Sequence, residues 1–242
     1  MAITFVGKAG VTGVGAGENL TIGTVPTGAI IMLSSASQGN ASLSTLTVGG
    51  ESAFLESTHS TGGTSTDAQC ELWWYYSRAG GTNVVVSPTY SASTRHAYSY
   101  YIYQGSAATT PLEFTSSGTG TGASPQTASV TVAAGSASRL LFQAVAFVTT
   151  ATGVGTITIA PGVGQTEEDE EDLPGTASLV AVSEESNDES GQGQTTMTAV
   201  GTDVGFSMNW ATVGTAIMLP RTVKKVERSQ TGFVFHQPRR VR

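Results

Sequence analysis

The sequence is poor in charged residues, which make up 12% of its 242 positions, against about a quarter in an average globular protein. Long solvent-exposed helices need Glu, Lys, Arg and Gln on their outer faces, so this shortage argues against a helical protein. In their place the chain has 36 Thr, 27 Ser and 30 Gly. Threonine favours strands, while glycine and serine favour the turns between them. The composition therefore predicts an all-β protein.

Cysteine and long apolar runs are also scarce. The single cysteine, Cys70, cannot form an internal disulfide. A chain of this length removes about 70% of its unfolded surface from water, so it needs neither a disulfide nor a metal to hold a core. The sequence contains no run of 18 apolar residues, which argues against a membrane span, and the first ten residues show no signal peptide. We expect a protein assembled in a cytoplasm, without a cofactor or a metal.

The charges that are present are unevenly distributed. Residues 1–220 contain four basic and 17 acidic residues, a formal charge of −13. Residues 221–242 contain seven basic residues and one acid, a formal charge of +6. A basic terminal arm binds phosphates in many nucleic-acid-binding proteins. An acidic protein surface, including that of a second copy of this chain, is an equally good partner, and we favour a protein over nucleic acid.

Short apolar or alternating runs recur between clusters of Gly, Ser and Thr, which is typical of a sandwich or barrel. None of them shows a helical stripe. The predicted strands are residues 3–6, 19–22, 29–35, 42–48, 53–57, 70–77, 83–88, 96–104, 126–132, 139–148, 156–159, 177–183, 195–200 and 209–219.

The hydrophobic pattern repeats along the chain. Segment 29–37 matches 139–147, segment 70–77 matches 177–183, and segment 97–103 matches 210–218. This predicts either two similar sheets packed face to face or two small sandwiches in tandem. We predict an antiparallel, jelly-roll-like β-sandwich with two pseudo-repeated halves. The expected boundaries are 1–104 for the first half, 105–122 for a Ser/Thr/Gly-rich linker, 123–220 for the second half and 221–242 for an extended C-terminal arm.

Three polar or glycine-rich segments predict loops. The stretch Gly13-Val-Gly-Ala-Gly17 resembles half of a dinucleotide fingerprint, but it does not join a buried strand to a helix, so we expect a flexible loop. Residues 167–172 are six consecutive carboxylates, which diverge on an extended chain and are a poor calcium site. Residues 184–194 are almost all polar. We expect the last two to be solvated loops, the acidic one suited to docking a basic arm.

Catalytic motifs are missing. The three histidines, His59, His96 and His236, are far apart and none stands beside a nucleophile motif. Cys70 begins an apolar strand, where it is typical of a small core residue. Glycoside hydrolysis would need two paired carboxylates, and nothing singles out a pair. We therefore predict no enzymatic activity, and a hydrolase is the least favoured hypothesis.

Aromatic residues gather in two predicted strands. Trp73, Trp74, Tyr75 and Tyr76 are consecutive, so alternate rings face opposite sides of one strand, and Tyr98 and Tyr100 share one face of another. One face belongs in the core. The other needs a cover, because exposed aromatic patches seldom lack a role. A protein contact is favoured over a sugar-stacking platform, and the candidate contact face consists of Trp74, Tyr76, Tyr98 and Tyr100.

The order of these segments resembles a group of phage virion proteins of the head decoration and tail-associated kind. The resemblance lies in Ile3-Thr-Phe-Val-Gly7, the apolar run 29–33, Leu72-Trp-Trp-Tyr-Tyr-Ser-Arg-Ala79, the run 100–105 and the segment 210–220. It covers about residues 1–220 and leaves the basic tail as an addition. It implies a β-sandwich structural protein of the virion, without deciding between head and tail.

Two functions follow as hypotheses. The first is a non-enzymatic capsid decoration or cement protein, a homo-oligomer that binds the major capsid protein or other virion proteins and does not bind a membrane. Its arm would clamp a neighbour through Arg221, Lys224, Lys225, Arg228, Arg239, Arg240 and Arg242. The alternative is a tail-fibre or head-fibre adhesin that binds host carbohydrate through Trp74, Tyr76 or the strand that holds Tyr98 and Tyr100.

Overall fold

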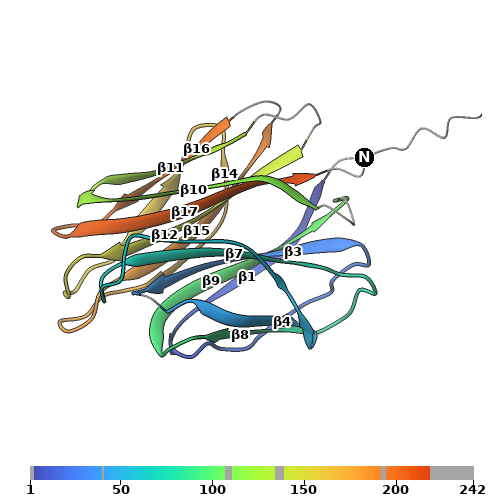
Figure 1. Ribbon diagram of the computed structural model, residues 1–242, viewed down its shortest axis with the longest axis horizontal. Helices are drawn as coiled ribbons and strands as arrows, with labels where there is room; N and C mark the ends of the chain where they lie inside the picture. Colours follow the sequence, from blue (N-terminus) through green and yellow to red (C-terminus); the bar gives the residue numbers. More distant parts are fainter. Residues whose placement is uncertain (1–2, 40, 107–110, 134–138, 192–194, 219–242) are drawn as a thin grey trace, which may run out of the picture.

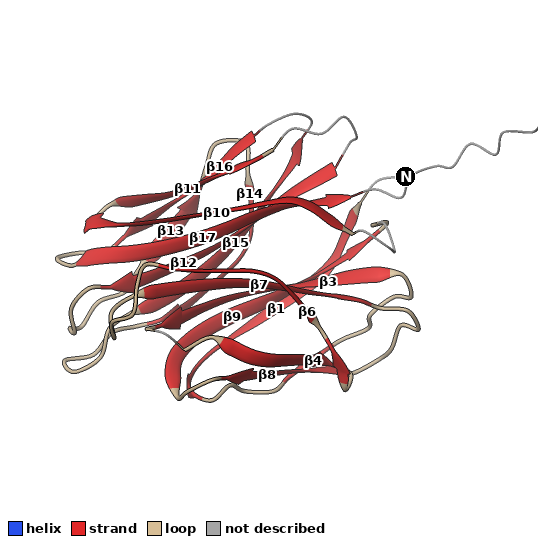
Figure 2. Cartoon of the chain, viewed as in Figure 1, coloured by secondary structure: helices blue, strands red, loops and turns tan. Residues whose placement is uncertain are grey.

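The computed structural model describes residues 3–39, 41–106, 111–133, 139–191 and 195–218 (Figure 1). Within these ranges the chain forms strands and no helix (Figure 2). The strands of the first half are β1 (Thr4–Gly15), β2 (Leu20–Ile22), β3 (Ala29–Gln38), β4 (Leu43–Val48), β5 (Glu51–Ser52), β6 (Phe54–Ser60), β7 (Ala68–Tyr76), β8 (Val84–Tyr90) and β9 (Thr94–Gln104). Those of the second half are β10 (Leu112–Ala123), β11 (Gln126–Val132), β12 (Arg139–Thr149), β13 (Thr158–Pro161), β14 (Thr166–Leu173), β15 (Val182–Gly191), β16 (Thr195–Thr202) and β17 (Ser207–Met218). The prediction of an all-β protein is confirmed.

Each half contributes one inner and one outer antiparallel sheet. The first inner sheet has the order β1-β9-β3-β7-β6 and the first outer sheet the order β2-β8-β4-β5. The second inner sheet has the order β10-β17-β12-β15-β14 and the second outer sheet the order β11-β16-β13. The two orders are the same when β1 to β4 are matched with β10 to β13, and β6 to β9 with β14 to β17. Among the described strands, β5 alone has no counterpart.

This topology confirms the two pseudo-repeated halves. The matches between 29–37 and 139–147 and between 97–103 and 210–218 coincide with the pairs β3/β12 and β9/β17. The third match was wrong, because the counterpart of β7 is β15, which begins only at Val182. The apolar residues before it belong to the preceding connection.

The halves are stacked in four layers. The two inner sheets pack face to face in the middle, with the first half (blue to green) below the second (green to red) in the view of Figure 1. Their shared core includes Met32, Tyr101 and Phe142. The rings of Tyr101 and Phe142 meet edge to face, with their centroids 5.3 Å apart. Each outer sheet covers the remaining face of its inner sheet, with one apolar cluster in the first half and two in the second. Both expected arrangements, sheets face to face and sandwiches in tandem, are therefore present together.

The segment expected as a linker forms β10, the edge strand of the second inner sheet. Its glycines allow this because they alternate with hydroxyl residues. A Cβ at Gly120 would lie 2.6 Å from the indole of Trp210, and one at Gly118 would lie 2.8 Å from the carbonyl oxygen of Ser129. The intervening Thr119 and Thr121 face solvent. Glycine therefore permits close packing inside while threonine keeps the strand extended.

The glycine-rich segment 13–17 was expected to be a loop, but its first three residues belong to β1, which pairs with β9 as far as Gly15. Two glycines of β1 make room for carboxylates of neighbouring segments. A side chain at Gly10 would collide with Glu171, and one at Gly13 with the carboxylate of Glu18. The glycines thus serve close packing in a strand rather than loop flexibility.

Residues 167–172 lie on β14 and residues 184–191 on β15, so the prediction of solvated loops was wrong for both, while residues 192–194 lie outside the described residues. On β14, Asp169 pairs with Lys8 of β1 at 3.4 Å, and the Glu170 Oε1 accepts a hydrogen bond of 3.0 Å from the backbone N–H of Ile159. Successive carboxylates point alternately to these two neighbours. On β15, the carboxylate of the fully buried Glu184 accepts a 2.7 Å hydrogen bond from Ser99. Partners from distant strands make these acidic strands compatible with the fold.

Candidate functional site

The basic arm lies outside the described residues. This applies to all of its predicted contact residues, Arg221, Lys224, Lys225, Arg228, Arg239, Arg240 and Arg242. The clamp therefore stays a prediction that rests on sequence.

The predicted aromatic contact face is only partly correct. Tyr98 and Tyr100 have 0% and 4% of their surface exposed, because the first outer sheet covers the face of β9 on which they lie. They are core residues, and the Tyr98 hydroxyl donates to the backbone carbonyl of Glu18. Trp74 and Tyr76 are half-buried. The candidate face is thus reduced to β7, where Trp74 stacks on Phe54 with centroids 4.8 Å apart.

That stacked pair belongs to a larger surface along the open edges of the inner sheets, which we call the β6–β10 edge. Its apolar part is Phe54 and Leu55, with 57% and 46% of their surfaces exposed. Strands β6 and β10 are edge strands of their sheets and contact each other, with the Thr115 hydroxyl donating to Glu56. The outer face of β10 continues with the hydroxyl residues Ser117, Thr119 and Thr121. This edge offers unpaired backbone groups, two apolar side chains and few charges.

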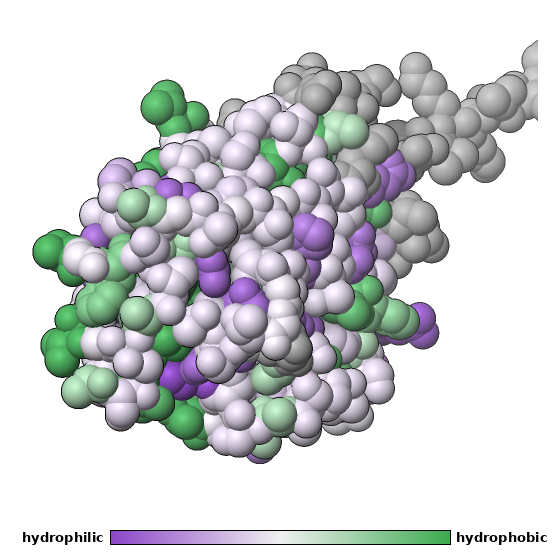
Figure 3. All heavy atoms as spheres, turned by 60° about the vertical axis from the view of Figure 1, so that its left-hand side comes forward, coloured by the Kyte–Doolittle hydropathy of each residue, from purple (hydrophilic) through white to green (hydrophobic). Residues whose placement is uncertain are grey.

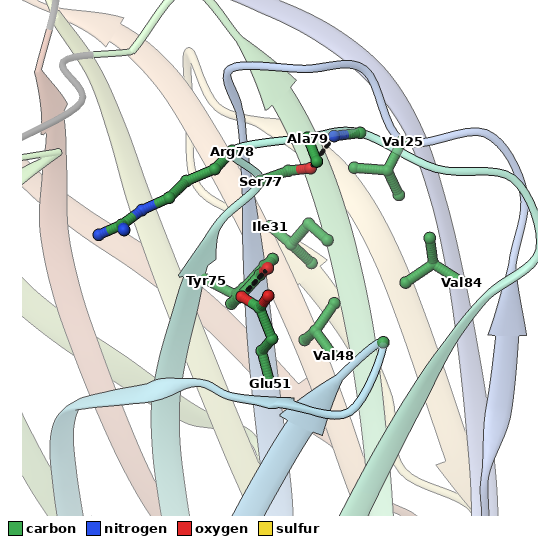
Figure 4. A pocket seen from close by; sticks show the side chains of 11 residues that line it. Val25, Ile31, Val48, Glu51, Tyr75, Ser77, Arg78, Ala79 and Val84 are labelled. Carbon is green, nitrogen blue, oxygen red and sulfur yellow. Dashed lines mark hydrogen bonds between the residues drawn. The ribbon is translucent and has the colours of Figure 1, made fainter.

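A second feature is a pocket of about 150 Å³ in the first half, between the first outer sheet and the end of β7 (Figure 4). Its apolar wall consists of Val25, Ile31, Val48 and Val84. Its polar side is formed by Glu51, Tyr75, Ser77 and Arg78. The Tyr75 hydroxyl donates a 2.6 Å hydrogen bond to Glu51 Oε2. Burial, followed by this bond and the charge of Glu51, raises the pKa of Tyr75 to about 12, so Tyr75 stays a neutral donor.

Local turns place the polar groups of the pocket. Val48 pairs with Glu51 across a two-residue turn in which Gly49 and Gly50 have φ values of 61° and 85°, as the tight hairpin turn requires. On the opposite side Gly80 also has a positive φ, of 68°, and a Cβ there would lie 2.9 Å from the backbone of Thr27. The Gly-Gly pair between two predicted strands was the sequence signal for this hairpin. The approach of Glu51 to Tyr75 had no such signal.

Two buried side chains of the first half, Glu71 and Cys70, have structural roles. Glu71 accepts hydrogen bonds from the backbone N–H of Leu43 and the side chain of Gln69, both 2.8 Å, and from the indole of Trp73 at 3.3 Å. Burial raises the pKa of Glu71 despite these bonds. Burial, together with the charges of Glu184 and Glu71, raises the pKa of the Cys70 thiol well above its usual value. A protonated, enclosed thiol is a poor nucleophile.

A cluster of acids lies where the second half meets β9. Asp172 stands near Glu170 and Asp203, and the Arg95 guanidinium donates to the backbone carbonyls of Leu173 and Pro174 at 3.2 and 2.6 Å. Burial and the charge of Glu170 raise the pKa of Asp172 to about 7. Within the described residues, no group of three or more His, Cys, Asp and Glu side chains is arranged to hold a metal ion.

The histidines do not come together. His96 is buried, with its ring stacked on Tyr90 at 4.6 Å between centroids and its Nε2 3.2 Å from a carboxylate oxygen of Glu18. His59 lies on the edge strand β6, and His236 is outside the described residues. His96 therefore has a packing role in the first half.

Comparison with protein families, curated proteins and solved structures found no match to this chain. In the part of the chain that the structure describes, no helix is long and apolar enough to cross a membrane.

Proposed function

We propose that this chain is a non-enzymatic structural protein of a bacteriophage virion, a decoration or cement subunit that strengthens the capsid lattice. The observation that carries the proposal is the β6–β10 edge. It leaves two stacked sheets open on the same side, where β6 and β10 contact each other and the apolar side chains of Phe54 and Leu55 are exposed. Open sheet edges are templates for pairing with another chain, and a protein that uses them assembles with neighbours.

We further propose that each half is a jelly roll. Numbered within its own half and with β5 set aside, the inner sheet has the order 1-8-3-6-5 and the outer sheet 2-7-4, in both halves. Except that strand 5 joins the inner sheet, this order is that of a jelly roll, in which the strands of two Greek keys alternate between two sheets. The jelly roll is an architecture of viral capsid proteins. Together with the resemblance to phage virion proteins, the paired topology supports a place in the particle.

The chemistry of the surface suits repeated contacts. Most of the face in Figure 3 is of intermediate hydropathy, as expected from Ser, Thr and Gly, with smaller polar and apolar areas. Hydroxyl groups can bond either to water or to a partner, whereas each buried Lys or Glu would need a counter-charge. Along the edge, Leu55 and Phe54 supply apolar area beside Ser117 and Thr119 of β10. A capsid protein or a second copy of this chain can bury this edge at little electrostatic cost.

The C-terminal arm is long and positively charged. Its 22 residues, 221–242, carry +6 against −13 for the rest of the chain. Fully extended, such a segment spans roughly 70 Å, enough to cross a neighbouring subunit. Attraction between the arm and an acidic body is screened by salt within about 8–10 Å. Many weak contacts repeated on a lattice add up to firm attachment, which raises the free energy needed to separate capsomers.

Incorporation into particles tests the proposal. We expect Leu55→Lys and the deletion of residues 221–242 each to reduce the amount of protein that copurifies with capsids. Val163→Lys is the matched control, since Val163 is a fully exposed valine on the connection between β13 and β14. Normal decoration by both altered proteins at moderate salt would refute the assembly role.

A further inference from the structure

The pocket lies beside β5, the one described strand that has no counterpart in the other half. In the first half, the connection between β4 and β6 forms β5 and places Glu51 over the pocket. In the second half, the connection between β13 and β14 instead directs Gln165 to the fold itself. Gln165 accepts a 2.8 Å hydrogen bond from the backbone N–H of Thr198 and donates to Gln143 at 3.3 Å. In the first half, by contrast, Glu51 lines a pocket and its side chain is exposed.

We infer that this pocket binds one ring of a neutral saccharide. Glu51 provides the acceptor that a sugar hydroxyl requires. Tyr75 bonds to its Oε2, while Oε1 has no hydrogen-bond partner among the described residues. The tyrosine therefore orients the carboxylate and leaves one oxygen for a ligand. A bond between a hydroxyl and a carboxylate is among the stronger hydrogen bonds because one partner is charged.

The charges around the pocket favour a neutral ligand. Glu51 and Arg78 line it together, and their opposite charges act in opposite directions on the Tyr75 hydroxyl. Glu51 would repel an anion. The Arg78 side chain extends away from the pocket (Figure 4), and its positive charge offsets part of the attraction of Glu51 for a cation. One carboxylate is also too few for a calcium ion, which takes six to eight oxygen ligands.

The remaining wall matches the C–H face of a sugar. Val25, Ile31, Val48 and Val84 form an apolar side opposite the polar groups (Figure 4). A sugar ring has the same division, with C–H groups on its faces and hydroxyls at its rim. At about 150 Å³ the pocket is smaller than the roughly 300–1,000 Å³ of sites for drug-sized ligands, so it fits one ring rather than an oligosaccharide. This site differs from the sugar platform that the sequence predicted on Trp74, Tyr76 or the strand that holds Tyr98 and Tyr100, and it is independent of the assembly role.

Saturation-transfer NMR with the full chain tests the inference, using glucose, galactose, mannose and N-acetylglucosamine as probes. We expect at least one of them to bind saturably with a Kd on the order of 1 mM, as the usual ligand efficiency gives for about 12 non-hydrogen atoms. Glu51→Ala should weaken this binding about tenfold or more, because a charged hydrogen bond is lost. Tyr75→Phe keeps the ring but frees the carboxylate, and should weaken it several-fold.

Glu167→Ala is the matched control, an exposed carboxylate on β14 of the other half, and should bind like the unaltered chain. Thermal unfolding of each variant distinguishes a loss of sugar binding from a loss of the fold. If Glu51→Ala does not fold, Glu51→Gln takes its place in the binding experiment. The inference is overturned if none of the four sugars binds, or if binding survives in folded Glu51→Ala. Tighter binding of n-butylamine or glucuronate than of every neutral sugar would also overturn it.

Discussion

Raising the pH from 5 to 8 should destabilise this protein, and Asp172 supplies the largest single reason. Burial and the charges of Glu170 and Asp203 raise the pKa of Asp172 from 3.8 to about 7, although Arg95 and a hydrogen bond from the backbone of Ile157 act in the opposite direction. A folded-state pKa above the unfolded value means that the folded protein holds the proton more tightly. Its contribution to stability is complete below about pH 4 and is lost as the pH rises through about 7.

The magnitude follows from the shift of about three pKa units, each worth about 1.4 kcal/mol. The unscreened value of about 4 kcal/mol is an upper bound because Asp172 is only partly buried. Discounted for solvent screening, we expect the free energy of unfolding to fall by about 2 kcal/mol between pH 5 and pH 8. Burial raises the pKa values of Glu170, Glu171 and Asp203 as well, so their contributions have the same sign.

Urea unfolding at several pH values between 5 and 8 measures this slope directly. Asp67 stays ionised throughout, since hydrogen bonds from Thr64 and Thr61 leave its pKa below 3.8 despite burial. In Asp172→Asn the slope should flatten, and the variant should be more stable than the unaltered chain at pH 8. A stability that rises with pH, or the same slope in Asp172→Asn, would refute this account of the acidic cluster.

Three substitutions and one labelling experiment test the packing. Phe142→Ala removes a ring from the core shared by the two inner sheets, and should lower the free energy of unfolding by about 3–5 kcal/mol in calorimetry. Two separate unfolding transitions in the unaltered chain would contradict a shared core. Gly120→Ala should cost about 1–3 kcal/mol, since its Cβ would lie 2.6 Å from the indole of Trp210. Gly7→Ala, where no atom lies within 4 Å, should be neutral or slightly stabilising by the same denaturation assay. Cys70 should resist thiol reagents in the folded protein and react promptly in urea, and fast labelling without denaturant would show that the core opens.

The sequence predicted the positions of most strands because their hydrophobic patterns are local. It did not show how many layers would cover them. β9 is buried along nearly its whole length because it lies between the second inner sheet and the first outer sheet. Tyr98 and Tyr100 were expected on an exposed face because a single sandwich leaves one side of each sheet open. A four-layer stack covers both sides.

The acidic strands β14 and β15 were missed for a different reason. Their residues lack the apolar alternation by which a strand is recognised, so they resemble loops. Two of the groups that accommodate them are far away in sequence, Lys8 on β1 and Arg95 on β9. A third, the backbone N–H of Ile159, lies on a different strand, β13. No local pattern contains such partners. The pocket was missed in the same way, since Glu51 and Tyr75 meet only after β5 and β7 are placed.

The central claim is that this chain is a lattice component that binds neighbours through its β6–β10 edge and basic arm. Cryo-electron microscopy of the phage particles that we propose contain the chain, with the chain marked by a specific antibody fragment, tests it most directly. We predict regularly spaced copies on the head, with β6 and β10 turned toward an adjacent subunit and density for residues 221–242 crossing onto it. Particles that lack the protein, or that carry it with the edge and the arm facing solvent, would contradict the claim.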